Sequence, residues 1–268
     1  MGAVPSTVAA SASASVSNPE IALILDTAFA WYSAEDSLQL GGHDPVRNGF
    51  TLQQLELHMA SSVDPFFRME ANVVFSQFGV EVEEAYATTT SLPGRLQLRA
   101  GQFLTRFGRV NPTHPHTWSF VDQTLLVGKF FGSEGSRGLG AELAWLMPFP
   151  WFAESLVSVT DASGECCARS FYGGNDLPLR SPTEFAVTGA LKQGGDLSPD
   201  VSLLGGVSVQ TGPNATGNGN RTAIVGADLT LRYKPTESAR RAALTWQSEA
   251  ALRARQVPDD NLRDVAVY

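Results

Sequence analysis

Long hydrophobic runs are missing from this chain of 268 residues. No apolar stretch approaches the ~20 residues that a transmembrane helix needs, which excludes the helical class of membrane proteins. Basic residues are also scarce: 19 Lys and Arg against 27 Asp and Glu give a net charge of −8, and they form no basic cluster. Nucleic acid is therefore not an expected partner.

Cysteine and the short motifs of common enzymes are nearly absent as well. The chain contains no Gly-x-Ser-x-Gly elbow, no His-Glu-x-x-His and no phosphate-binding loop, so we predict neither enzymatic activity nor a cofactor. The only two cysteines are adjacent in sequence and cannot both chelate one ion without unusual backbone geometry. No ligand spacing of a known metal motif occurs, and we expect no metal site. The weak candidates for one are His114, His116, Cys166 and Cys167.

The N-terminus lacks the basic residues that begin an export signal. Residues 1–18 are small and polar, and the first Lys or Arg of the chain is Arg47. Ala10-Ser11-Ala12 and Ala12-Ser13-Ala14 nevertheless resemble signal-peptide cleavage sites. We interpret residues 1–18 as the remnant of an export signal, with a disordered Ser/Ala leader as the alternative, and residues 19–268 as one domain.

What the chain does contain is a repeated alternation of apolar and polar residues. In residues 67–73, Phe67, Met69 and Val73 alternate with Arg68, Glu70 and Asn72. A period of two places these two sets on opposite faces of a sheet. The same alternation recurs in segments of roughly ten residues. The predicted strands are residues 21–32, 49–61, 65–78, 81–89, 95–107, 138–147, 152–160, 183–192, 201–210, 222–233 and 241–255.

This pattern predicts an all-β fold, an antiparallel transmembrane β-barrel of the outer-membrane type with about eleven strands. One face would contact lipid and the other a watery lumen, with short connections at one end and long ones at the other. A closed barrel needs every edge paired, and residues 261–268 begin a further strand that stops. We therefore expect the barrel domain, residues 19–268, to be truncated at its C-terminus.

One segment, residues 106–137, does not resemble a strand and is far longer than the ~4 to 6 residues of a typical connection. It holds several aromatic residues, which can pack against a wall. The basic residues near its two ends, together with its length, suggest a loop that narrows a pore. The expected anchors are Trp118, Phe120 and Phe130.

A family resemblance rests on motifs in and around this segment. Gly101-Gln102-Phe103 leads into Phe107-Gly108-Arg109-Val110-Asn111, then into residues 114–122 (HPHTWSFVD) and Gly132-Ser133-Glu134-Gly135. In these motifs the chain resembles the phosphate-selective porin O/P family of outer-membrane porins. The resemblance implies a wide barrel in the cell outer membrane, surrounded by lipid, through which anions or small solutes diffuse. A homo-oligomer such as a trimer is compatible with it.

The anion selectivity of that family is carried by basic residues on the lumen side. The candidates here are Arg68, Arg95, Arg99, Arg106, Arg109, Lys129 and Arg137. Glutamates would share the same lumen. The alternative to a role in selectivity is therefore that these basic residues only pair with glutamates across neighbouring strands. Two other functions stay open at this point. One is an outer-membrane receptor or metal-linked, zinc-regulated uptake protein without a plug domain, and the other is a soluble β-sandwich binding protein.

Overall fold

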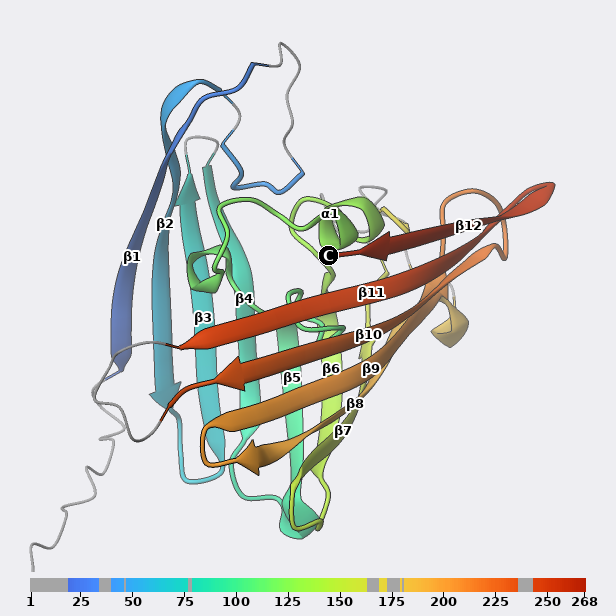
Figure 1. The fold of residues 1–268 in the computed structure, drawn as a ribbon. Coiled ribbons are helices and arrows are strands. Elements are labelled where there is room, and N and C mark those ends of the chain that lie inside the picture. Colours follow the sequence, from blue (N-terminus) through green and yellow to red (C-terminus); the bar gives the residue numbers. More distant parts are fainter. Residues whose placement is uncertain are drawn as a thin grey trace, which may run out of the picture.

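The protein folds into one antiparallel sheet in which every strand pairs with its neighbours in sequence, as the computed structural model in Figure 1 shows. The structure describes residues 19–33, 40–45, 47–76, 79–162, 169–172, 179, 181–235 and 243–268. The strands are β1 (Glu20–Ala30), β2 (Gly49–Ser62), β3 (Phe67–Ser76), β4 (Gly79–Thr89), β5 (Leu96–Leu104), β6 (Arg137–Leu146), β7 (Phe152–Thr160), β8 (Ala186–Ser198), β9 (Val201–Pro213), β10 (Arg221–Tyr233), β11 (Leu244–Val257) and β12 (Asp260–Val267). The helices are short: α1 (Leu125–Phe130) and the 3₁₀ turns η1 (Pro93–Arg95), η2 (Pro115–Thr117) and η3 (Pro182–Glu184).

The all-β antiparallel prediction is confirmed, but the strand number differs from it. Twelve strands are described instead of about eleven, because Pro258 and Asp259 form a two-residue turn that lets β12 pair with β11. The described strands do not close into a barrel, and the sequence predicted an incomplete one. Among the described residues, β1 pairs only with β2 and β12 only with β11, so the sheet has two free edges. A barrel closes only when its first and last strands pair.

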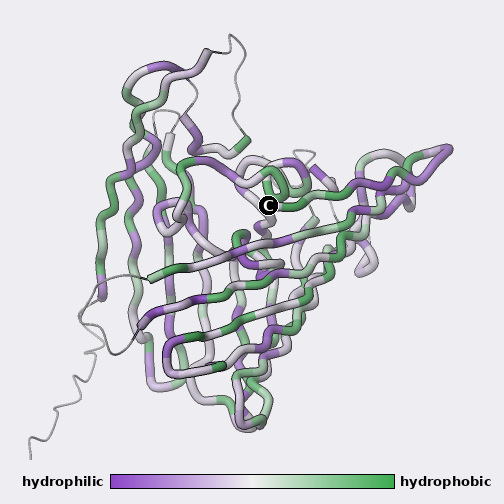
Figure 2. The backbone as a smooth tube through the Cα atoms, in the orientation of Figure 1, coloured by the Kyte–Doolittle hydropathy of each residue, from purple (hydrophilic) through white to green (hydrophobic). Residues whose placement is uncertain are grey.

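The alternation of side chains between two faces is confirmed, and β10 shows it most clearly. Val225 and Leu229 are exposed on one face, whereas Ile224 and Asp228 are buried on the other. The change of hydropathy colour from residue to residue along the strands is visible in Figure 2. We call the face that carries Ile224 and Asp228 the inner face and the opposite one the outer face.

The sheet curls around its inner face. In Figure 1, β10 and β11 cross in front of β4–β6, and the long connection between β5 and β6 lies between these two parts of the sheet. Most connections at one end of the sheet are short, and most at the other end are long, as the sequence predicts. The exceptions at the second end are the two-residue connections 77–78 and 258–259.

Residues 105–136, which we call the inner segment, leave the sheet and return to it at one point. The backbone N–H of Thr105 donates to the carbonyl of Ser136 at 2.8 Å. Asn111 connects the two ends of the inner segment, because its Nδ2 donates to the Thr105 carbonyl at 2.7 Å and its Oδ1 accepts from the Ser136 N–H at 2.6 Å. The predicted strand 95–107 therefore ends early, at Leu104.

The main hydrophobic core lies between the inner segment and the inner face. The segment contributes Phe107, Val110, Leu126, Val127, Phe130 and Phe131, and the sheet contributes Ala186, Ile224 and Ala251. Helix α1 lies in this core and is only six residues long. No helix in the described part of the chain combines the length and the apolar character that crossing a membrane requires.

Candidate cation site and charged inner face

Four of the predicted selectivity residues form ion pairs with glutamates. Arg106 connects two strands, because its guanidinium lies 2.9 Å from Glu142 Oε1 and 2.8 Å from Glu154 Oε2. Glu142 also pairs with Arg99 at 3.1 Å. Arg137 pairs with Glu81, and Arg68 lies 2.8 Å from Glu20 and 3.2 Å from Glu70. Of these contacts, only Arg99 with Glu142 joins neighbouring strands, as the pairing alternative expects. Arg68 and Arg137 reach glutamates of β1 and β4 across an intervening strand, and Arg106 lies on the inner segment.

The other three predicted selectivity residues have no ion pair with any residue that the structure describes. Arg95 is exposed in the turn η1 between β4 and β5, at φ +61°. Lys129 is exposed on α1. Arg109 is half-buried on the inner segment, where its backbone N–H donates to Glu249 Oε2 at 3.1 Å. Arg109 is therefore a basic residue of the inner segment that forms no ion pair with the described residues.

The three predicted anchors all contact the main core. Phe130 is buried in α1, and the Arg253 guanidinium lies 4.8 Å from its ring centroid. Trp118 and Phe120 pack against the same core and against each other, with ring centroids 5.4 Å apart. Phe120 also contacts the ring of Tyr268. The aromatic residues of the inner segment therefore attach it to β10–β12 and the residue that follows.

Gly108 lets the inner segment approach the sheet closely. Its φ is +61°, and a Cβ at this position would collide with the carboxylate of Glu249. Its N–H donates to Ser208 Oγ at 3.0 Å, and its carbonyl accepts from Lys192 Nζ at 2.7 Å. Lys192 also pairs with Asp228. The motif Phe107-Gly108-Arg109 is thus explained by a backbone position that only glycine fits.

A β-bulge in β4 turns two adjacent glutamates toward the inner face. Asn72 of β3 pairs with Glu84 and Val73 with Val82, so Glu83 is an extra residue without a partner in β3. Strict alternation would place Glu83 and Glu84 on opposite faces, but a bulge re-aims one side chain. Both glutamates are buried, and Glu84 Oε1 accepts from the Leu104 N–H at 2.7 Å.

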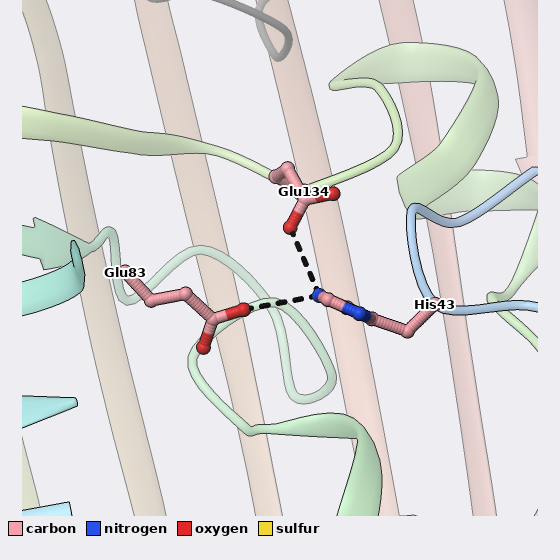
Figure 3. A group of neighbouring side chains, drawn as sticks. All are labelled: His43, Glu83 and Glu134. Carbon is pink, nitrogen blue, oxygen red and sulfur yellow. Dashed lines mark hydrogen bonds and ion pairs between the residues drawn. The ribbon is translucent and has the colours of Figure 1, made fainter. Parts of the chain in front are cut away.

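His43 reaches Glu83 from the connection between β1 and β2. Asp44 holds this connection, since its carboxylate accepts from the N–H groups of Gly41 at 2.7 Å and Gln123 at 2.8 Å. His43 Nε2 then lies 3.2 Å from Glu83 Oε1 and 3.5 Å from Glu134 Oε2, as drawn in Figure 3. Three distant parts of the chain, residues 40–45, β4 and the inner segment, meet at this imidazole.

His114 reaches the other oxygen of Glu83 from the inner segment. Its Nδ1 lies 3.0 Å from Glu83 Oε2 and 3.8 Å from Glu56 Oε2, and its Nε2 lies 2.8 Å from Glu84 Oε2. The ring of His116 stacks on that of His114, and its Nδ1 lies 3.0 Å from Glu56 Oε2. Each of the two candidate groups, His43 with Glu83 and Glu134, and Glu56 with Glu83 and His114, brings three possible ligand atoms within 4.8 Å of one another.

The whole histidine content of the chain gathers around these glutamates. His58, the fourth histidine, is linked through Asn72, whose Oδ1 lies 2.6 Å from its Nδ1 and whose Nδ2 lies 2.9 Å from His114 Nε2. Among the described residues, no Lys or Arg pairs with the carboxylates of the group. We call the set His43, Glu56, Glu83, Glu84, His114, His116 and Glu134 the His/Glu cluster.

The glutamates keep the two loop histidines protonated when no other cation is near. Burial alone would lower the pKa of His43, but hydrogen bonds and charges from Glu134 and Glu83 outweigh it and raise this pKa to about 10. Burial likewise opposes protonation of His114, whereas Glu83, Glu84 and Glu56 raise its pKa to about 10. Buried carboxylates need such compensation, because an unpaired buried charge is costly.

A small pocket of about 40 Å³, open at its mouth, adjoins the His/Glu cluster. His43, Glu83, His114 and Glu134 line it together with Trp118 and Arg137. Small ions or solutes therefore have a route to the cluster from this side.

Sequence reasoning missed most of this cluster. His114 and His116 were weak metal candidates, whereas His43 and Glu134 carried no expected ligand role. Cys166 and Cys167, the other two weak candidates, lie outside the described residues. A signal was present: a chain with only four histidines places two of them in His-Pro-His within its longest non-strand segment.

Comparisons with known proteins give one relative and no family. A protein of Aquifex aeolicus (strain VF5), which is named "Uncharacterized protein", is 34% identical to this chain in an alignment of 243 positions that covers 80% of this chain and 51% of the relative. The chain thus spans about half the length of the curated relative it matches. No family model and no solved structure matches. The resemblance to the phosphate-selective porins stays a prediction.

Proposed function

We propose that the chain forms part of the wall of an outer-membrane porin through which small solutes or anions diffuse. The single observation that supports this most strongly is the inverted polarity of the sheet. Large apolar residues with exposed fractions of 37–82% occur on the outer face, and buried Gln, Glu, Asn, Thr and Asp side chains occur on the inner face. A transmembrane barrel has this arrangement, because its outer face meets lipid and its inner face water.

The soluble β-sandwich is a weaker explanation of the same sheet. In a sandwich the apolar face packs against a second sheet. Here the described strands form one sheet, and its apolar face is uncovered. Aromatic residues at strand ends, among them Trp31, Trp145, Trp151 and Trp246, are exposed and resemble the girdles of membrane barrels. A closed pore further requires that the edges β1 and β12 be paired, with each other or with further strands.

The inner segment supports a pore with a constriction. It crosses the inner face and carries Arg109, an arginine without an ion pair among the described residues. A charge in a constriction acts on every ion that passes it. Because Arg68, Arg99, Arg106 and Arg137 are neutralised by glutamates, we propose that Arg109 and Lys129, the predicted selectivity residues of the inner segment without an ion pair among the described residues, are the main source of any preference for anions. A receptor function would instead predict saturable solute binding.

The test of the membrane location uses two substitutions in adjacent residues of β10. Leu229 is exposed on the outer face, and Thr230 points to the inner face. Both variants are made in the full protein, exported by a Gram-negative host. Leu229→Arg should make the free energy of membrane insertion less favourable by about 2–4 kcal/mol, and Thr230→Arg should have little effect. The readout is the amount of protein that only detergent extracts from the outer-membrane fraction. Equal tolerance of both substitutions would contradict the membrane location.

The test of the pore uses planar bilayers with a salt gradient. Arg109→Glu should move the reversal potential toward cation preference, because it reverses the charge on the inner segment. Arg95→Glu, the same charge change in an exposed turn, is the matched control and should leave the reversal potential unchanged. The absence of single channels, or equal shifts for both variants, would overturn the porin proposal.

A further inference from the structure

Three buried atoms of the His/Glu cluster have no hydrogen bonds with the described residues. They are Glu56 Oε2, His114 Nδ1 and His116 Nδ1. His114 Nδ1 lies 3.0 Å from Glu83 Oε2, yet the two atoms are not aligned for an N–H···O bond. Glu56 as a whole is 1% exposed. Buried polar atoms without partners are rare in native proteins and call for an explanation.

The spacing of these atoms fits a small metal ion. With bonds of 2.0–2.2 Å, the nitrogen and oxygen ligands of a tetrahedral Zn²⁺ lie about 3.3 Å from one another. The separations from His114 Nδ1 to Glu83 Oε2 and to Glu56 Oε2 are 3.0 and 3.8 Å. His116 lies outside this three-ligand group, and its Nδ1, 3.0 Å from the same Glu56 oxygen, contacts the carboxylate rather than the ion position.

The neighbours of these atoms match those of metal ligands. Metal-bound histidines commonly donate their other ring N–H to a carboxylate, which fixes the tautomer. Glu84 Oε2, 2.8 Å from His114 Nε2, is placed to accept that proton and so leaves the Nδ1 lone pair for an ion. On the far side of Glu83, His43 contacts the second oxygen at 3.2 Å and orients the carboxylate.

Charge balance favours a cation at the same point. Glu56, Glu83, Glu84 and Glu134 bring four negative charges into a space with no Lys or Arg partner among the described residues. A divalent ion would neutralise two of them directly. Imidazole with carboxylate is a donor set that suits zinc and the neighbouring transition metals better than Mg²⁺ or Ca²⁺.

We propose that Glu56, Glu83 and His114 bind one divalent transition-metal ion of the zinc class, with Glu84, His43 and His116 as positioning residues that contact these ligands. The ion connects β2 and β4 to the inner segment and thereby fixes that segment to the part of the sheet that the aromatic core does not reach. This proposal does not depend on the porin function.

The experiment measures metal binding by the full purified protein. After removal of metal with a chelator, the protein is dialysed against Zn²⁺ alone, and bound metal is counted by mass spectrometry, with Mg²⁺ as the comparison ion. We expect one Zn²⁺ per chain and no Mg²⁺. Glu56→Gln and His114→Gln should each weaken Zn²⁺ binding by more than about 100-fold, and His43→Gln by about 10–100-fold, the range for residues that support ligands.

The matched control is Glu70→Gln, which changes a glutamate of the neighbouring strand β3 that contacts Arg68 and Tyr86 but none of the proposed ligands. It should bind Zn²⁺ as the native protein does. A second readout is trypsin cleavage after Arg109, which Zn²⁺ should slow in the native protein and in Glu70→Gln but not in Glu56→Gln. If either ligand variant fails to fold, the other variant and the native protein still give the answer.

Two results would overturn the metal site: a native protein that takes up no Zn²⁺, or Glu56→Gln and His114→Gln variants that bind it as tightly as the native protein. In the first case the cluster is held by imidazolium-carboxylate ion pairs alone. Membrane extraction and conductance are measured separately, so the porin proposal stands or falls independently of this result.

Discussion

The inner segment is attached to the sheet in two chemically different ways. Toward β10–β12 it packs through aromatic and aliphatic residues such as Phe107, Phe131 and Leu126, which are buried against Ile224 and Ala251. Toward β2 and β4 it is attached through histidines and glutamates of the His/Glu cluster. The first attachment depends mainly on packing, to which the hydrogen bond from the Arg109 N–H to Glu249 adds. The second depends on which cation neutralises the glutamates, so the two should respond differently to the same perturbation.

Breaking the apolar attachment should have the largest effect. Leu126→Ala should lower the free energy of unfolding by about 3–5 kcal/mol, the upper part of the range for a buried leucine, because the side chain is fully buried and leaves a cavity. Leu125→Ala is the control, since this adjacent leucine of α1 is 59% exposed. Urea denaturation followed by the fluorescence of tryptophan, including Trp118 of the inner segment, measures both. Equal losses would show that the core is not where the structure has it.

Breaking the hydrogen bonds of Asp44, which is next to His43 of the His/Glu cluster, should lower the free energy of unfolding by an intermediate amount. Asp44→Ala leaves the N–H groups of Leu40, Gly41 and Gln123 without their acceptor. We expect a loss of about 2–3 kcal/mol, because hydrogen bonds to charged groups contribute about 1.5–3 kcal/mol each and water replaces part of them. Asp44→Asn keeps one oxygen and should lose less. The same urea titration tests this order of stability. An Asn variant that is less stable than the Ala variant would contradict the role of Asp44 as a hydrogen-bond acceptor.

The smallest expected effect is at the start of α1, inside the inner segment itself. Thr124 caps the helix, with its Oγ1 accepting from the Val127 N–H at 3.4 Å. Thr124→Ala should cost about 1 kcal/mol, and Thr124→Ser should be nearly neutral because serine caps equally well. A neutral Thr124→Ala would mean that packing of Leu126 and Val127 alone holds the helix.

The positions of the strands follow from the sequence because the alternation has a period of two. Val225 and Leu229 opposite Ile224 and Asp228 are sufficient to predict β10 and the facing of its side chains. Boundaries are less well predicted where a loop begins with the residues of a strand. Residues 105–107 continue the β5 pattern, yet they turn inward because Asn111 and Ser136 bind Thr105.

The His/Glu cluster could not be predicted from local patterns. His43 lies in the β1–β2 connection, Glu83 in β4, and His114 and Glu134 in the inner segment, and only the folded chain brings these three parts together. Pairing across neighbouring strands explains Arg99 with Glu142 from sequence spacing, since these two residues are register partners. No comparable register connects a loop histidine with a strand glutamate.

Because of the bulge, Glu83 could be deleted without disturbing the pairing of β3 with β4 around it. Because Val73 already pairs with Val82 and Asn72 with Glu84, deleting Glu83 would join two stretches that are in register. Every outward side chain of β4 would keep its facing, and only the inward carboxylate shared by His43 and His114 would disappear. A single-codon insertion or deletion is therefore sufficient to gain or lose the ligand, so related proteins can differ in this site while the apolar pattern of the strand stays the same.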